Sequence, residues 1–155
     1  MAPIRILVSA CLLGEKVRYD GGHRKDPFLL RTLGPFVEWV PVCPEVDCGL
    51  PVPREAMRLV GDPDRPRLVT VRTGADRTGK MEAWAENRLD ELSRIDLWGY
   101  VCKSGSPSSG MERVKVYGDR GVPARSGAGI FTRRFMEWYV ATMRGPTDSA
   151  NRRAG

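Results

Sequence analysis

Cysteines at four positions and one glutamate are the side chains of this sequence best suited to chemistry. Cys43 and Cys48 stand in one short stretch with Glu45 between them, and Cys11 and Cys102 lie elsewhere in the chain. In a cytosolic protein such cysteines are more often metal ligands or nucleophiles than disulfides. Thiolates select zinc or iron-sulfur clusters, and a nearby carboxylate can carry a proton. The pattern predicts a metal centre with an acid-base group beside it.

The spacing of the cysteines leaves the choice of metal open between zinc and an iron-sulfur cluster. Structural zinc sites usually use paired Cys-x2-4-Cys motifs, and the Cys43/Cys48 pair has no matching second pair and no nearby histidine. If Cys11, Cys43 and Cys48 held a cubane cluster, one iron would lack a protein ligand and could bind a substrate. The alternatives are a zinc module that only stabilises the fold and thiols that bind no metal.

A loop of small residues, from Ser104 to Gly110, is the second candidate site. Its sequence is Ser-Gly-Ser-Pro-Ser-Ser-Gly, and its hydroxyls and backbone N–H groups could bind an anion or a substrate oxygen. The same composition is also typical of a plain turn. His23, the sole histidine, lies in a polar stretch and is expected at the surface. Glycine motifs for nucleotide binding are absent from the sequence.

Alternating strands and helices must position these residues. Expected strands cover 4–9, 36–42, 67–72, 99–103 and 113–117, and expected helices cover 27–33, 78–94 and a segment from 130 onward that carries Phe131, Phe135, Trp138 and Tyr139. This order predicts an α/β fold with a mostly parallel sheet flanked by helices. Ligands bind at the carboxyl ends of the strands in such sheets, and the cysteines lie near predicted strand ends.

Local signals mark several boundaries. Asp26 and Thr78 are expected to cap the helices that follow them. Four prolines in the stretch 41–55 predict a stiff loop without a helix, because proline lacks a backbone N–H and restricts the chain. The cysteines of that stretch would therefore sit in a rigid loop directly after a strand.

Composition indicates one globular domain. With 155 residues, 41% hydrophobic and 28% charged, the chain can bury a core of its own. We expect residues 1–144 to form this domain and residues 145–155 a disordered basic tail. Apolar runs are too short for a membrane span and no signal peptide is evident, which predicts a soluble cytoplasmic protein. The net charge of +6 is compatible with a phosphate-bearing or nucleic-acid partner, so a basic nucleic-acid-binding protein is a further alternative.

Five motifs together closely resemble the thiouracil desulfidase family, over residues 4 to 137. They are Val-Ser-Ala-Cys-Leu-Leu-Gly at 8–14, Val-Arg-Tyr-Asp-Gly-Gly at 17–22, Cys-Pro-Glu at 43–45, Gly-Leu-Pro-Val-Pro-Arg at 49–54 and Ser-Pro-Ser-Ser-Gly-Met-Glu-Arg at 106–113. The resemblance implies a single Rossmann-like domain with a [4Fe-4S] cluster on three cysteines. Its implied reaction is removal of sulfur from thiouracil without redox turnover, which gives uracil and hydrogen sulfide.

The resemblance also implies roles for individual residues. Catalytic roles fall to Glu45 and Ser106, and the motifs place Tyr19, Asp20, Ser108 and Ser109 as substrate contacts. Family members carry a cysteine as third cluster ligand in Ser-Pro-Ser-Cys-Gly, where this chain has Ser109. We therefore predict that Cys11, Cys43 and Cys48 bind the cluster, with Cys102 as the alternative third ligand. The expected substrate is a small thiolated pyrimidine, and thiouridine in RNA is the alternative.

Overall fold

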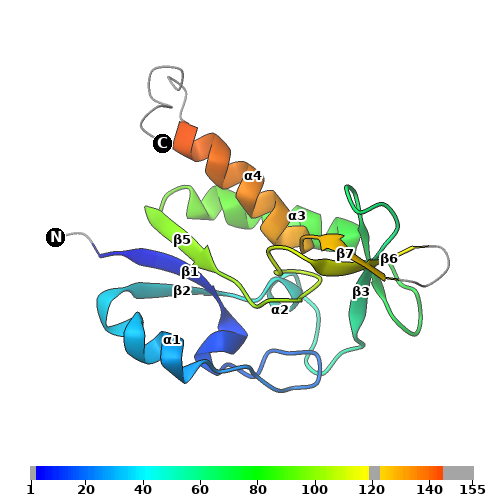
Figure 1. Cartoon of the computed structure of the whole chain (residues 1–155), viewed down its shortest axis with the longest axis horizontal. Coiled ribbons are helices and arrows are strands. Elements are labelled where there is room, and N and C mark those ends of the chain that lie inside the picture. The colour runs from blue at the N-terminus through cyan, green and yellow to red at the C-terminus, as the bar shows by residue number, and fades with distance from the viewer. Residues whose placement is uncertain (1–2, 119–122, 145–155) are drawn as a thin grey trace.

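Three parallel strands form the first sheet, in the order β2-β1-β5 (Figure 1). In this computed structural model, which describes residues 3–118 and 123–144, they are β1 (Arg5–Ser9), β2 (Glu38–Val42) and β5 (Leu97–Val101). In the register, Leu7 lies opposite both Val40 and Tyr100. All three strands therefore end at the same edge of the sheet, where their carboxyl ends meet.

Two long helices cover one face of this sheet, α3 (Thr78–Leu92) and α4 (Ile130–Arg144). Their apolar sides share a core with the sheet, in which the rings of Trp84 and Phe131 lie 5.0 Å apart. The buried residues of this core are Leu7, Val42, Ala85, Leu89, Leu92, Leu97, Phe131 and Phe135. On the opposite face, Leu29 from the short helix α1 (Pro27–Thr32) packs against the cluster that contains Val8. The α/β fold with helices on a parallel sheet is thus confirmed.

A second sheet stands beside the first and was not expected. Its order is β4-β3-β6-β7, with β3 (Met57–Val60), β4 (Arg67–Thr70), β6 (Val114–Tyr117) and β7 (Pro123–Gly127). β3 runs antiparallel to β4 and parallel to β6, and β6 runs antiparallel to β7. The sequence did not predict β3 or β7, because neither segment has an uninterrupted apolar run or clean alternation.

The expected caps gave one correct and one wrong prediction. Asp26 caps α1, because its Oδ1 accepts a hydrogen bond from Leu29 N at 3.0 Å. Thr78 does not cap α3. Its Oγ1 accepts a hydrogen bond from Leu68 N in β4 at 2.7 Å, while Asp76 Oδ1 accepts one from Thr78 N at 2.9 Å. The Thr78 hydroxyl therefore accepts a hydrogen bond from β4 and is not available for the cap of α3 that the sequence had predicted.

The proline-rich stretch also differs from its prediction, since it contains the one-turn helix α2 (Pro44–Asp47). Pro44 occupies the first helical position, where no backbone N–H is needed. Asp47 Oδ2 accepts a hydrogen bond from Cys43 N at 3.0 Å and closes the turn from the other end. The remaining short elements are the 3-10 turns η1 (Ala10–Leu13) and η2 (Gly34–Phe36). Residues 145–155, the expected tail, lie outside the described residues.

None of the helices in the described part of the chain is long and apolar enough to span a membrane.

Candidate active site

A cavity of about 360 Å³ lies at the carboxyl ends of the first sheet. Its walls come from the segments that follow β1, β2 and β5, joined by residues 17–19, by Arg54 and Ala56, and by Met57 at the start of β3. β1 has β2 on one side and β5 on the other, so the chain leaves β1 and its neighbours in different directions and opens a crevice between them. Among the lining residues are Cys11, Cys43, Glu45 and Ser106.

Cys11 reaches the cavity from η1, directly after β1. Its side chain is buried, and its carbonyl accepts hydrogen bonds from Gly14 N at 3.2 Å and Arg24 N at 2.9 Å. Burial raises the pKa of the Cys11 thiol, and the positive charges of Lys103, Arg18 and Arg24 partly oppose this shift. The cations therefore favour a negative charge at this sulfur.

Cys43 reaches the cavity from the end of β2, at the residue that precedes α2. Its Sγ lies 3.9 Å from Val17 O, and its N–H is held by Asp47. Burial raises the pKa of Cys43 to about 11. The unligated thiol is therefore protonated at neutral pH, and a metal that binds it must displace that proton.

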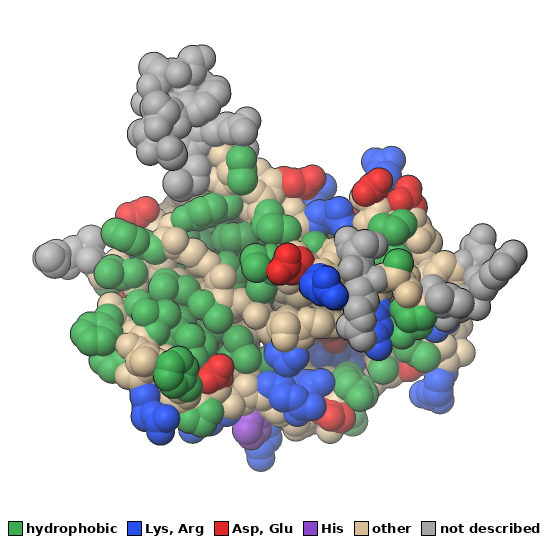
Figure 2. Space-filling model, viewed as in Figure 1, with side chains coloured by type: hydrophobic (Ala, Val, Ile, Leu, Met, Phe, Trp, Pro, Cys, Tyr) green, Lys and Arg blue, Asp and Glu red, His purple; other side chains and the backbone are tan. Residues whose placement is uncertain are grey.

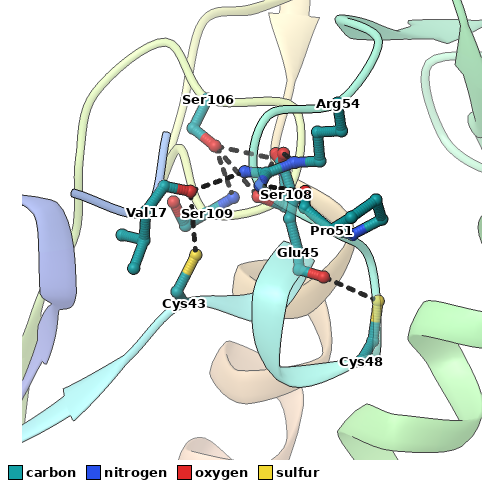
Figure 3. Close-up of polar contacts among 9 residues, drawn as sticks. All are labelled: Val17, Cys43, Glu45, Cys48, Pro51, Arg54, Ser106, Ser108 and Ser109. Atoms are coloured by element: carbon teal, nitrogen blue, oxygen red, sulfur yellow. Dashed lines mark hydrogen bonds and ion pairs between the residues drawn. The ribbon is translucent and has the colours of Figure 1, made fainter. Parts of the chain in front are cut away.

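Glu45 projects from α2 into a network of side-chain hydrogen bonds (Figure 3). Its Oε1 lies 2.8 Å from Arg54 Nε, and its Oε2 accepts a hydrogen bond from Ser108 Oγ at 3.0 Å. Arg54 also donates to Val17 O at 2.8 Å and to Pro51 O at 3.0 Å. The carboxylate is thus held in one orientation at the wall of the cavity. Sequence reasoning gave Arg54 no role, although it lies in one of the motifs that carried the family resemblance.

The loop from Ser104 to Gly110, called the serine loop below, folds around the hydroxyl of Ser106. Ser106 Oγ accepts hydrogen bonds from Ser108 N at 3.2 Å and Ser109 N at 3.1 Å, and it lies 3.1 Å from Ser108 Oγ. The loop is anchored to the start of α4, where Phe131 N donates to Ser108 O at 2.9 Å. Gly129 allows this approach, because a Cβ there would stand 2.4 Å from Ser108 C. The loop is therefore fixed in place, and Ser108 and Ser109 both line the cavity.

Cys48 does not line the cavity. Five positions after Cys43, it is turned about 140° around the axis of α2 at about 100° per residue, and Figure 3 shows the two cysteines on opposite sides of this helix. Cys48 Sγ donates to Glu45 O at 3.3 Å and packs against the core of the second sheet. This placement does not support its predicted role as third ligand.

Cys102 also lies outside the lining of the cavity. Its neighbour Lys103, which follows β5 in the same loop, does line it. Within residues 3–118 and 123–144, no three Cys, His, Asp or Glu side chains gather in an arrangement that could hold a metal ion. The alternative third ligand therefore has no support either.

Of the two residues in the turn at 19–23 that were predicted to contact substrate, one lines the cavity. Tyr19 lines the cavity and is 42% exposed. Asp20 lies outside the lining, and its Oδ1 accepts a hydrogen bond from Gly22 N at 2.9 Å, which lowers the pKa of the Asp20 carboxyl. Asp20 therefore shapes the turn, and its predicted contact with substrate gains no support. His23 is exposed as expected, with Nδ1 accepting from Lys25 N at 3.0 Å.

Besides Arg54, the cavity wall contains two further cations that the sequence did not point to, Arg18 and Lys103. Burial lowers the pKa of Lys103, and the nearby charges of Arg18 and Arg24 lower it further. The Nη1 atom of Arg18 is buried without a hydrogen-bond partner. Figure 2 shows Lys and Arg side chains gathered near the lower middle of this face. The site is therefore electropositive and suited to a negatively charged group.

Comparison with known proteins finds a family match and two similar proteins. A family model described as 2-thiouracil desulfurase matches residues 6–145. The solved structure of TudS, a [4Fe-4S]-dependent thiouracil desulfidase, is similar with a TM-score of 0.70 and 34% identity, over 86% of this chain and 85% of that one. YbbK, an uncharacterized protein of Bacillus subtilis (strain 168), is 31% identical over 110 residues, which cover 68% of this chain and 72% of the relative. The chain therefore belongs to the 2-thiouracil desulfurase family, as its sequence motifs indicated.

Proposed function

We propose that this protein is a [4Fe-4S]-dependent desulfidase that hydrolyses the thiocarbonyl of a thiolated uracil. The C=S bond breaks and a C=O bond forms with the oxygen of water. Both protons of that water leave with the sulfur as hydrogen sulfide, so the reaction needs no electron donor or acceptor. The observation that carries the proposal is the meeting of Cys11, Cys43 and Glu45 at one cavity, in a chain that belongs to this family.

Two residues of the cavity are suited to bind irons of the cluster. Cys11 and Cys43 offer two soft sulfur donors from two different strand ends, and the cations beside Cys11 favour the charge of a thiolate. When bound, the cluster would supply a Lewis acid that polarises the thiocarbonyl and accepts the sulfide. Four free cysteines suit a reducing, cytoplasmic location for such an enzyme.

Glu45 is the group that would move protons. Its carboxylate can accept a proton from the attacking water and return it to the leaving sulfur. Ser108 donates its hydroxyl hydrogen to Glu45, so Ser106, which already accepts two backbone N–H groups, is left as the donor in the Ser106–Ser108 contact. The two hydroxyls thus form an oriented chain that leads to the carboxylate. A substrate that displaces Ser108 from this contact could receive the hydrogen bond of Ser106.

The cavity has the size of a site for a small molecule, which suits a thiolated base, and Tyr19 at its wall offers a ring for stacking against that base. A second candidate substrate is 4-thiouridine carried on a phosphate backbone, as in RNA. Arg18 and Lys103 favour it, since Arg18 Nη1 has no partner within the described residues and phosphates bind such cations.

Sulfide release after anaerobic reconstitution tests the proposal. The protein, loaded with iron and sulfide, is mixed with 2-thiouracil, 4-thiouracil, 4-thiouridine or a short RNA that contains 4-thiouridine. Iron content, the visible spectrum and hydrogen sulfide are then measured. We expect about four irons per chain and sulfide release from at least one of these compounds. Binding of zinc alone, or a full cluster with no release from any of them, would contradict the proposed function.

A further inference from the structure

Two of the four cysteines line the cavity, one fewer than the family resemblance implies for the cluster. Cys11 and Cys43 line it, whereas Cys48 and Cys102 do not. Within the described ranges no third carboxylate, imidazole or thiol completes a metal-binding group with them. Among residues 3–118 and 123–144, a third donor would therefore be of a residue type outside that set, and serine is the polar residue most frequent in the wall.

Of the five serines in the wall, Ser104 is exposed to solvent, and three others have hydroxyls that are already engaged. Ser9 Oγ accepts a hydrogen bond from Lys103 N at 2.9 Å. Ser106 Oγ accepts two backbone N–H groups, and Ser108 Oγ donates to Glu45. For Ser109, which is 4% exposed, the described residues provide no hydrogen bond to Oγ that meets normal geometry. Its hydroxyl is therefore available to a ligand in the cavity.

The backbone of Ser109 is held firmly, as a metal ligand requires. Its N–H donates to Ser106 Oγ at 3.1 Å, and its carbonyl accepts from Thr132 Oγ1 at 2.7 Å. Gly129 packs directly against it, since a Cβ on Gly129 would stand 2.5 Å from Ser109 N. Ser109 is thus held in the loop that follows β5 and lines the same cavity as Cys11 and Cys43.

A neighbouring hydroxyl gives independent support. Tyr100 Oη is buried and has no hydrogen-bond partner in this structure, which is a costly state for a phenol. Burial raises the pKa of the Tyr100 phenol, and the side chains of Ser9, Thr132 and Ser109 oppose that shift, so these side chains lie within reach of its oxygen. An oxygen anion at Ser109 would offer it an acceptor, and the Tyr100 hydroxyl would stabilise that anion.

We propose that Ser109 supplies the third protein ligand, so that two thiolates and one serine oxygen hold the cluster. The inference rests on the proposed function, in that it assumes a cluster in this cavity. On binding, the Ser109 O–H bond breaks, an Fe–O bond forms and the proton leaves to solvent, with no change in oxidation state. Oxygen is a harder donor than sulfur, so the third bond is weaker than a thiolate bond and the cluster is more easily lost.

Four substitutions test this assignment through cluster binding instead of turnover: Ser109→Ala, Ser109→Cys, Cys48→Ser and Cys102→Ser. Each protein is reconstituted anaerobically, and its iron and acid-labile sulfide, its rate of iron loss to a chelator and the EPR spectrum of the reduced cluster are measured. Ser109→Ala should hold less iron and lose it faster than the unmodified protein. Ser109→Cys should lose iron more slowly by about tenfold or more, because even groups that only touch a metal ligand alter affinity by about 10–100-fold. Its EPR g-values should also shift.

The two cysteine variants serve as matched controls and should behave like the unmodified protein. Equal iron content, chelator rate and EPR spectrum in Ser109→Ala and the unmodified protein would overturn the serine ligand. Loss of the cluster in Cys48→Ser or Cys102→Ser would overturn it in favour of that cysteine. If Ser109→Cys binds a cluster and the unmodified protein does not, Ser109 is not a ligand. The cavity would still be able to hold the cluster that the proposed function requires. If neither binds iron, the proposed function fails as well. Circular dichroism of each apo protein separates these results from misfolding.

Discussion

Arg54 Nε lies 2.8 Å from Glu45 Oε1, and both side chains are nearly buried, with 6% and 13% of their surfaces exposed. The same guanidinium donates to the carbonyls of Val17 and Pro51. One side chain therefore joins two loops of the cavity wall to the carboxylate that we propose moves protons. The planar guanidinium has several N–H donors in fixed directions and can therefore bind all three partners. The ammonium group of lysine does not offer this geometry.

Removal of the Arg54 guanidinium should destabilise the protein strongly. Arg54→Met leaves the Glu45 carboxylate buried beside Ser108 without its counter-charge, and breaking a buried pair from one side costs about 3–5 kcal/mol. Urea denaturation of the apo protein at pH 7 measures this loss. The double variant Arg54→Met/Glu45→Gln should recover much of it, because no unpaired charge remains. If the two changes are additive, Arg54 does not act on Glu45 through their ion pair.

Glu45→Gln should keep the cluster and lose turnover. The amide is similar in shape but cannot accept a proton, and loss of a general acid-base group costs about 10²–10⁴-fold in rate. Iron analysis and sulfide release from the best substrate measure the two effects separately. Glu91→Gln, on the exposed end of α3, is the matched control and should leave both unchanged. Retained activity in Glu45→Gln would remove Glu45 from the mechanism.

Gly129→Ala should disrupt the serine loop. The new Cβ would stand 2.4 Å from Ser108 C and 2.5 Å from Ser109 N, and both are backbone atoms that cannot move aside freely. We expect a loss of stability of about 1–3 kcal/mol or more in thermal or urea unfolding, together with reduced iron content. Gly79→Ala in α3 meets no atom within 4 Å and should be neutral or stabilising by about 0.4–1 kcal/mol. Equal stability of the two variants would show that the loop tolerates displacement.

Glu55 should make stability depend on acid pH. Its carboxylate accepts hydrogen bonds from Thr73 Oγ1 and Thr73 N, both at 2.7 Å, and from Arg72 N. The Thr73 side chain, followed by these backbone groups, lowers the pKa of Glu55 below its ordinary 4.5. The stabilisation is therefore fully present above pH 4.5 and is lost as pH falls through the lower folded pKa. Melting curves between pH 7 and pH 3 should show Glu55→Gln less stable than the unmodified protein at pH 7, with the difference closing at acid pH. A constant difference would exclude titration of Glu55 as the cause.

Much of the first sheet was predictable from sequence, because its signals are local. The apolar run at 4–9 marked β1, and Asp26-Pro27 marked the start of α1. Since the carboxyl ends of parallel strands share an edge, cysteines placed directly after two strands had to approach one another. The presence of Cys11, Cys43 and Glu45 at one cavity follows from that rule.

Tertiary structure decided which of the remaining side chains face this cavity. The phase of α2 turns Cys48 away from Cys43, and Cys102 lies outside the cavity although its neighbour Lys103 lines it. Packing between distant segments decided the pairing of Arg54 with Glu45, the hydrogen bond that Leu68 N of β4 donates to Thr78, and the second sheet. Sequence periodicity records only which side of its own element a residue occupies. What lies opposite that side depends on contacts between segments far apart in the chain, so the surroundings of Ser109 emerged only from the folded molecule.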